Sequence, residues 1–141
     1  MPARSSASRR TVLRGAAAVP VAGLALAACG PGDDAQGAAA PTAPVDLGAG
    51  SEVARGGAKL YRDHNVVVSR DASGALKAYS TVCTHAGCPI NELRGTTLVC
   101  PCHGSEFDAV TGKVVRAPAT EPLTELPVKA AGGRIIAGPG A

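Results

Sequence analysis

The sequence predicts an all-β fold, a small antiparallel sandwich or barrel, from about Ser51 to the end of the chain. Two observations lead to this prediction: short β-prone runs alternate with turn residues, and no window shows a helical period of apolar residues. The 141 residues have room for one small domain plus processing segments. Aromatic residues make up only 2% of the chain, so the core will be modest. Such domains often need a disulfide or a metal for stability.

The predicted strands are three or four residues long and rich in Val, Leu, Ile, Thr and Tyr. They are residues 59–61, 66–68, 76–79, 97–99, 113–115, 126–128 and 134–136. Turn segments rich in Gly, Asp and Ser separate several of them, at 71–74, 111–112 and 132–133. Pro118, Pro122 and Pro127 divide the last third of the domain into loops and edge strands, because proline cannot donate a hydrogen bond to a sheet.

The positive charge of the chain is concentrated at its N-terminus. Ten of the 14 basic residues and all 11 acidic residues follow position 28, so that part carries a net charge of −1. The body of the chain has no Lys/Arg cluster, and we therefore expect no nucleic-acid partner.

Residues 1–28 have the pattern of an export signal. The segment Ser8-Arg9-Arg10-Thr11-Val12-Leu13-Arg14 resembles the twin-arginine signal, and a 13-residue apolar run follows from Ala16 to Ala28. This run contains Pro20 and Gly23 and is too short to cross a bilayer as a helix. Twin-arginine export carries folded proteins, which lets a cofactor be inserted in the cytoplasm first. The resemblance therefore implies an exported protein that holds a cofactor.

The next segment resembles the processing site of a bacterial lipoprotein. Leu26-Ala27-Ala28-Cys29-Gly30 matches a lipobox, in which the chain is cut before a cysteine that is then acylated. We expect Cys29 to carry lipid and to anchor the protein to the membrane. Fourteen of the 21 residues from 30 to 50 are Ala, Gly or Pro, so residues 29–50 are predicted to be a lipidated cysteine followed by a flexible linker, and residues 51–141 to be the folded domain.

Two short motifs carry the predicted chemistry. The first is Cys83-Thr84-His85-Ala86-Gly87-Cys88, and the second is Cys100-Pro101-Cys102-His103-Gly104-Ser105. Together they place four cysteines and two histidines within a short stretch of chain. Zinc uses these residue types, although usually with a C-x₂₋₄-C pair on each arm. A framework of disulfides alone would leave the two histidines unexplained.

A third interpretation rests on family resemblance. The two motifs resemble the C-T-H-x-G-C and C-P-C-H-G-S motifs of the Rieske 2Fe-2S family, and the resemblance covers roughly residues 51–141. It implies a Rieske-type sandwich or barrel with a subdomain of loops that binds one 2Fe-2S cluster. In that family Cys83 and Cys100 would bind one iron and His85 and His103 the other, while Cys88 and Cys102 would form a disulfide. Two neutral imidazoles in place of two thiolates remove negative charge, so the cluster accepts an electron more easily.

The residues around the motifs imply how such a cluster would be tuned. Ser105 occupies the family position whose hydroxyl donates to a bridging sulfide, whereas Phe107 stands where a tyrosine is frequent. Without that second hydroxyl we expect a lower potential than in the high-potential members, suited to quinols such as menaquinol. Ala86 replaces a larger apolar shield. Residues 117–119, Ala-Pro-Ala, resemble a third loop that covers the cluster. We expect His64 to be a surface turn residue.

The resemblance implies an electron-transfer subunit of an oxidoreductase and not a complete enzyme. We expect an iron–sulfur component of a quinol–cytochrome c oxidoreductase of the cytochrome bc type, lipid-anchored at the outer face of the cytoplasmic membrane. Its partners would be a cytochrome b/c-type protein or an oxidoreductase large subunit, and a quinol. Two alternatives remain: a stand-alone lipoprotein electron carrier, and a small subunit of another exported oxidoreductase such as arsenite oxidase. We do not expect a Rieske oxygenase, because no histidine follows His103 to build a second iron site.

Overall fold

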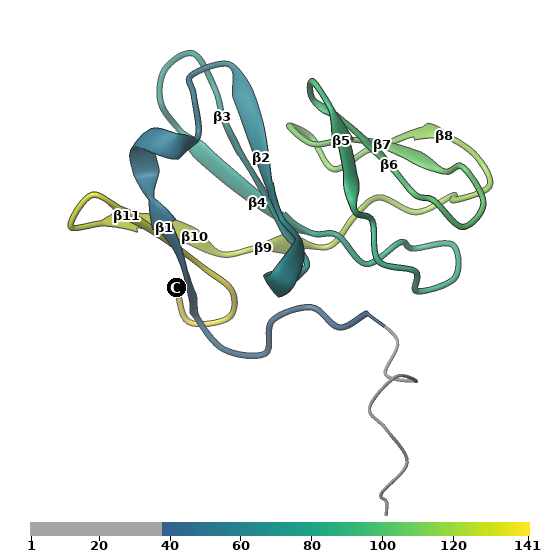
Figure 1. Ribbon diagram of the computed structural model, residues 1–141, viewed down its shortest axis with the longest axis horizontal. Coiled ribbons are helices and arrows are strands. Elements are labelled where there is room, and N and C mark those ends of the chain that lie inside the picture. Colours follow the sequence, from purple (N-terminus) through teal and green to yellow (C-terminus); the bar gives the residue numbers. More distant parts are fainter. Residues whose placement is uncertain (1–37) are drawn as a thin grey trace, which may run out of the picture. The chain divides into compact units, whose positions relative to one another are not determined.

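The computed structural model describes residues 38–141, and within them it confirms the predicted all-β fold. Three antiparallel sheets account for the strands, and the only helical elements in this part of the chain are 3₁₀ turns at Gly50–Glu52 and Arg62–His64 (Figure 1). The predicted export signal and Cys29 lie outside the described residues. No helix within residues 38–141 is long and apolar enough to cross a membrane.

The central sheet has apolar residues on both faces. Its strand order is β2 (Gly57–Tyr61), β3 (Val66–Arg70), β4 (Leu76–Ser80) and β9 (Glu125–Leu126). Successive side chains of a strand point to opposite faces. Val66 and Val68 therefore enter one core, with Leu126 and Ile135, while Val67 enters a second core. All three valines are fully buried, so β3 separates two cores. Burial on both faces explains why its sequence is a continuous apolar run.

The first core is closed by a three-stranded sheet from the two ends of the domain. Its order is β1 (Val45–Ala49), β11 (Arg134–Ala137) and β10 (Val128–Ala131). Gly132 and Gly133 turn the β10–β11 hairpin with φ of 57° and 78°, a left-handed conformation that glycine adopts without strain. Asp46 of β1 accepts a hydrogen bond from Arg134 Nε at 2.6 Å.

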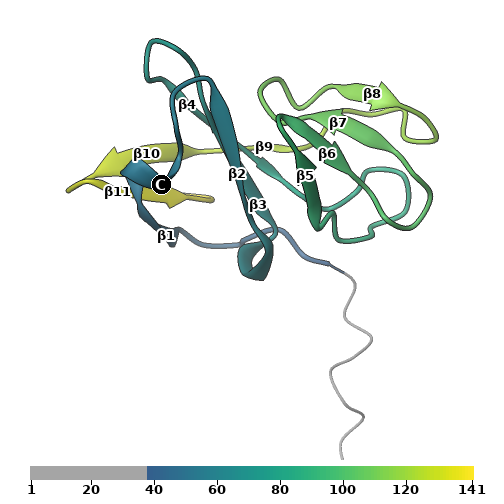
Figure 2. The same cartoon turned by 45° about the horizontal axis from the view of Figure 1, so that its top comes forward.

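The second core lies beneath a four-stranded meander that carries both motif loops. The meander consists of β5 (Glu92–Arg94), β6 (Thr97–Val99), β7 (Glu106–Asp108) and β8 (Val114–Arg116), paired in sequence order. Leu98 and Phe107 face each other across β6 and β7, and both are fully buried. The loop 83–88 precedes β5, and the loop 100–105 joins β6 to β7. In both views the meander lies beside β2–β4, on the side opposite β1, β10 and β11 (Figures 1 and 2).

The predicted boundary between linker and domain at residue 50 is wrong. Residues 45–49 form β1 and pair with β11, and the Asn65 side-chain amide donates a hydrogen bond to the Ala39 carbonyl at 3.0 Å. The high Ala, Gly and Pro content concealed the strand, whose one buried apolar residue is Leu47, exposed by only 6%. The folded domain therefore begins earlier than predicted.

The other differences concern short strands. The predictions missed β5 and β7, because Glu92, Arg94, Glu106 and Asp108 interrupt their apolar pattern. The predicted strand 126–128 is split at Pro127 into β9 of the central sheet and β10 of the terminal sheet. This proline breaks the strand where the chain passes from one sheet to another, because proline cannot donate a hydrogen bond to a sheet.

The position of β1 leads to a stability prediction. We expect Leu47→Ala to lower the free energy of unfolding by about 2–4 kcal/mol, because it removes the buried anchor of β1 and leaves a cavity. Val115→Ala is the matched control: Val115 is 59% exposed, and its truncation should change stability by less than about 0.5 kcal/mol. Urea unfolding of the full chain followed by circular dichroism measures both. If both substitutions change the free energy of unfolding equally, β1 is not part of the folded core, and the boundary predicted at residue 51 is correct.

Candidate metal centre

Two loops of similar backbone structure form the site. In the loop 83–88, the Cys83 N–H donates to the Cys88 carbonyl and the Gly87 N–H to the Cys83 carbonyl, both at 2.8 Å. In the loop 100–105, the Cys100 N–H donates to the Ser105 carbonyl at 2.9 Å, and the Gly104 N–H donates to the Cys100 carbonyl at 3.0 Å. Each loop is therefore a tight turn whose first residue is a cysteine.

The glycine near the end of each turn has a positive φ. Gly87 has φ 72° and Gly104 has φ 77°, values that an L side chain rarely adopts. A Cβ atom built on either glycine would meet no atom within 4 Å. These positions therefore favour glycine for its backbone conformation and not for close approach of a neighbouring residue.

The two loops bring a pair of free thiols together inside the protein. Among residues 38–141 the free cysteines are Cys83 and Cys100, exposed by only 2% and 1%. Both belong to the second core, with Phe107 and Leu98. Burial raises the pKa of the Cys100 thiol, and the neighbouring Cys83 adds to this effect. Two adjacent thiols in an apolar environment become thiolates readily only when a cation binds them.

The two motif histidines lie at the exposed ends of the same loops. The His85 and His103 rings are 4.8 Å apart between centroids and are nearly perpendicular, at 84°. Both residues are exposed, in contrast to the buried thiols. The site thus has two sulfur donors inside and two nitrogen donors at the surface. His64 is exposed in the 3₁₀ turn Arg62–His64, as predicted, and it belongs to neither loop.

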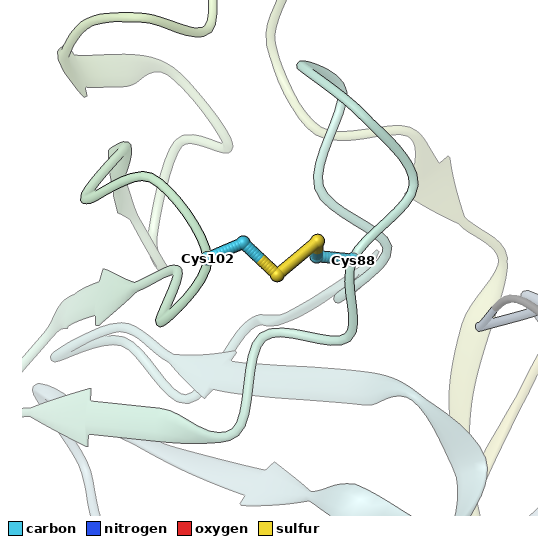
Figure 3. The surroundings of a disulfide bond; sticks show 2 residues. All are labelled: Cys88 and Cys102. Carbon is cyan, nitrogen blue, oxygen red and sulfur yellow. A yellow bond between two sulfur atoms is a disulfide. The ribbon is translucent and has the colours of Figure 1, made fainter.

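A disulfide joins the two loops. Cys88 and Cys102 are bonded, with their Cα atoms 6.6 Å apart, and Figure 3 shows the bond crossing the gap between the loops. The sulfur atoms of Cys88, Cys100 and Cys102 all lie within 4.8 Å of one another. Two of these sulfurs are bonded to each other, so the group is a clamp beside a free thiol and not a three-cysteine metal site. The disulfide interpretation explains two of these cysteines, but Cys83 and Cys100 still require another function.

The two predicted tuning residues are both buried close to the thiols. Ser105 and Phe107 are 0% exposed, and Phe107 packs in the same core as Cys83 and Cys100. The Ser105 Oγ accepts a hydrogen bond from the Ala119 N–H at 3.0 Å. Since this bond uses a lone pair of the oxygen, the hydroxyl proton is free to be donated elsewhere.

The third segment, residues 117–121, contacts both loops. Besides the bond from Ala119 to Ser105 in the second loop, the Thr84 hydroxyl of the first loop donates to the Glu121 carbonyl at 2.7 Å. Sequence reasoning identified 117–119 as a covering loop, but it missed Thr84 and Glu121. Their interaction joins residues 37 positions apart through a main-chain carbonyl, and no residue pattern marks such a contact.

The arrangement defines a class of protein: a small β domain in which two cysteine sulfurs and two histidine rings are placed so that they could hold a metal centre. Two cysteines and two histidines would also suit zinc, so the protein family must identify the metal. Residues 43–127 match the model of the Rieske [2Fe-2S] domain. The chain belongs to the Rieske family, and it is an electron-transfer protein whose domain binds a 2Fe-2S cluster.

Several curated relatives have the same domain. The chain is 35% identical over 94 residues to the cytochrome b6-f complex iron-sulfur subunit of Chlorobaculum thiosulfatiphilum, covering 65% of this chain and 51% of that protein. It is 42% identical over 74 residues to the cytochrome bc1 complex Rieske iron-sulfur subunit of Corynebacterium diphtheriae, covering 47% of this chain and 18% of that protein. The match thus spans about half or less of these relatives.

Solved structures give the same result for the fold. The cyanobacterial plasma membrane Rieske protein from Synechocystis PCC 6803 is 33% identical, with a TM-score of 0.52, and the match covers 66% of this chain and 97% of that one. The Rieske-type all-β architecture is therefore confirmed.

The disulfide leads to a second stability prediction. We expect the double substitution Cys88→Ser and Cys102→Ser to lower the free energy of unfolding by about 3 kcal/mol, because the bond closes a loop between residues 14 positions apart. Urea unfolding of the full chain measures this change, with Ser51→Ala, an exposed substitution outside the clamp, as the control. An unchanged urea midpoint in the double variant would show that the disulfide does not stabilise these loops.

Proposed function

We propose that this chain is the iron–sulfur component of a quinol–cytochrome c oxidoreductase of the cytochrome bc type. The observation that supports this proposal is the difference in exposure between the two ligand pairs: the two thiols are buried, whereas the two imidazoles are exposed. A cofactor held this way is insulated on one side and accessible on the other. The names of the Chlorobaculum and Corynebacterium relatives supply the type of complex.

The ligand assignment is part of the proposal. Cys83 and Cys100 hold one iron, and His85 and His103 hold the other. The residues fit this role, because both thiols are free and both rings are adjacent, whereas Cys88 and Cys102 are bonded to each other. When bound, the cluster supplies a one-electron acceptor and donor. The exposed imidazoles give a quinol a nitrogen to which it can hydrogen-bond, so a proton and an electron can leave it at the same place.

The location follows from the N-terminal segment. A twin-arginine signal would export the domain after its cofactor is inserted, and acylation of Cys29 would then anchor it at the outer face of the cytoplasmic membrane. The segment between Cys29 and Ala39, the first residue with a hydrogen bond to the domain among those the structure describes, would be the tether. It is shorter than the sequence predicted, which limits how far the domain can reach from the membrane.

A second candidate is a subunit of another exported oxidoreductase. A relative from Haloferax mediterranei, whose name assigns it provisionally to a respiratory nitrate reductase, is 50% identical over 52 residues, covering 36% of this chain and 24% of that protein. Purification of the full chain from solubilised membranes distinguishes the two. Co-purifying cytochrome b supports the cytochrome bc type, and a molybdenum subunit in its place would reject that type in favour of the second candidate.

Substitution of the proposed ligands tests the site. We expect Cys83→Ser and His103→Ala to lose iron, sulfide and the visible absorption of the cluster, because each removes a donor. His64→Ala is the matched control and should keep the full iron content, since His64 lies outside both loops. Circular dichroism confirms that each variant is folded. Full iron content in a folded His103→Ala protein would show that this histidine is not a ligand.

The buried Phe107 leads to a prediction about potential. We expect Phe107→Tyr to raise the reduction potential, because a hydroxyl added beside the thiols can donate a hydrogen bond that stabilises the more negative reduced state. A net hydrogen-bond energy of about 1–1.5 kcal/mol corresponds to roughly 40–60 mV for a one-electron couple. A redox titration monitored by circular dichroism measures it, with Phe107→Leu as the packing control. No rise, or an equal rise in the leucine variant, would contradict the tuning role of this position.

A further inference from the structure

A cavity of about 510 Å³ that is open to the surface lies among the terminal strands, away from the two loops. It is bordered by the 3₁₀ turn after β1, the residues before β2, the end of β3 and the β10–β11 hairpin. Its lining consists of Gly50, Ser51, Val53, Ala54, Arg55, Arg70, Ala130 and Gly133. Both views place β1, β10 and β11 on the side of the domain opposite β5–β8, so this cavity is separate from the metal centre (Figures 1 and 2).

Two arginines line the cavity, and the main chain holds each of them in place. Arg70 Nη2 donates to the Gly50 carbonyl at 2.8 Å, and Arg55 Nη1 donates to the Ala72 carbonyl at 3.1 Å. A guanidinium has five N–H donors, so each side chain is oriented while most of its donors are unused. Arg70 Nε is buried and has no hydrogen-bond partner within residues 38–141.

The acidic side chains of the surrounding elements bind other groups. Asp46 pairs with Arg134, which lowers the Asp46 pKa, and Glu52 pairs with Lys59. Asp71 accepts hydrogen bonds from the Ser73 hydroxyl and from the main-chain N–H groups of its own turn, which lowers its pKa. Neither cavity arginine forms an ion pair with a carboxylate in the part of the chain that the structure describes.

Small residues keep the space in front of the arginines open. Gly50, Ala54, Ala130 and Gly133 contribute little or no side chain to the lining. A Cβ atom on Gly50 would lie 3.4 Å from Arg70 Nη2 and 3.3 Å from the Gly133 carbonyl oxygen, closer than most such contacts. A larger residue there would push against the guanidinium, so the observed orientation of Arg70 depends on a small residue at position 50.

We propose that this cavity binds a phosphate-type oxyanion through Arg55 and Arg70. The planar guanidinium matches the spacing of phosphate oxygens, and charge-assisted hydrogen bonds to it are strong. Two oriented cations without a carboxylate favour an anion of more than one charge over a single carboxylate. The oxyanion has two possible sources, free phosphate in solution or the headgroup of an anionic phospholipid.

The experiment is a titration of the cluster-loaded full chain followed by ¹H–¹⁵N NMR of the arginine Nε–H groups and the Gly50 and Gly133 amides. One arm adds inorganic phosphate, and the other adds phosphatidylglycerol vesicles with phosphatidylcholine vesicles as reference. Saturable shifts with phosphate identify the free ion, and shifts with phosphatidylglycerol alone identify the headgroup. Absence of saturable shifts at these groups in both arms would overturn the proposal.

Three variants assign the binding to the cavity. Arg55→Gln and Arg70→Gln should each weaken binding by at least about 10-fold, the effect of losing one charge-assisted contact. Lys129→Gln removes the same charge from the residue beside Ala130, on the opposite face of β10, and should leave binding unchanged. Arg55 is exposed, so its variant should fold even if Arg70→Gln does not. If Lys129→Gln weakens binding as much as Arg55→Gln does, the binding is non-specific electrostatic attraction and the proposed site is rejected.

The same samples separate this proposal from the proposed function. The cluster spectrum of each variant is recorded beside its binding curve, and it should not change, because the cavity is separate from the metal centre. Absence of binding with a normal cluster spectrum would reject the anion site alone. Absence of the cluster in the unsubstituted protein would reject the proposed ligand set, whatever the cavity binds.

Discussion

The domain depends on holding two short loops side by side so that their cysteine thiols meet inside and their histidines meet at the surface. Each loop is a tight turn closed by two main-chain hydrogen bonds, with a left-handed glycine near its end. Neither turn could fix its position relative to the other. The Cys88–Cys102 disulfide provides that constraint on one side, and the segment 117–121 provides it on another, since it bonds to Thr84 and to Ser105.

The sheets support the loops. The meander β5–β8 carries one loop within it and the other before it, and Phe107 belongs to the same buried core as the thiols. The central strand β3 contributes Val67 to this core and Val66 to the core on the other face, so the loop-bearing meander rests on a sheet that is itself supported from behind. Because the core contains few aromatic residues, the domain depends on apolar packing against both faces of the central sheet. The disulfide adds stability that so small a core does not supply.

The sequence was most informative where function requires particular residues close together in the chain. The paired motifs indicated the family, and the resemblance implied the disulfide that the structure contains. The burial of Cys83 and Cys100 and the exposure of the two histidines came from the structure. The strand β1 was missed because Ala and Gly hide its single anchor, Leu47. The hydrogen bond between Ala119 and Ser105 uses a main-chain donor, and the arginine cavity joins residues 50–55, Arg70 and residues 130–133 through folding alone. Contacts of this kind have no local pattern, so only the folded structure reveals them.

The central claim is that two histidines and two cysteines of this chain share one cluster. Pulsed EPR of the reduced full chain, with ¹⁵N introduced only into histidine, tests it most directly, because the spectrum reports nitrogen bound to the paramagnetic iron. The expected result is the low mean g value of a histidine-ligated centre with couplings from two histidine nitrogens, one each from His85 and His103. A spectrum without histidine coupling, or a protein that contains zinc and gives no EPR signal, would contradict the claim.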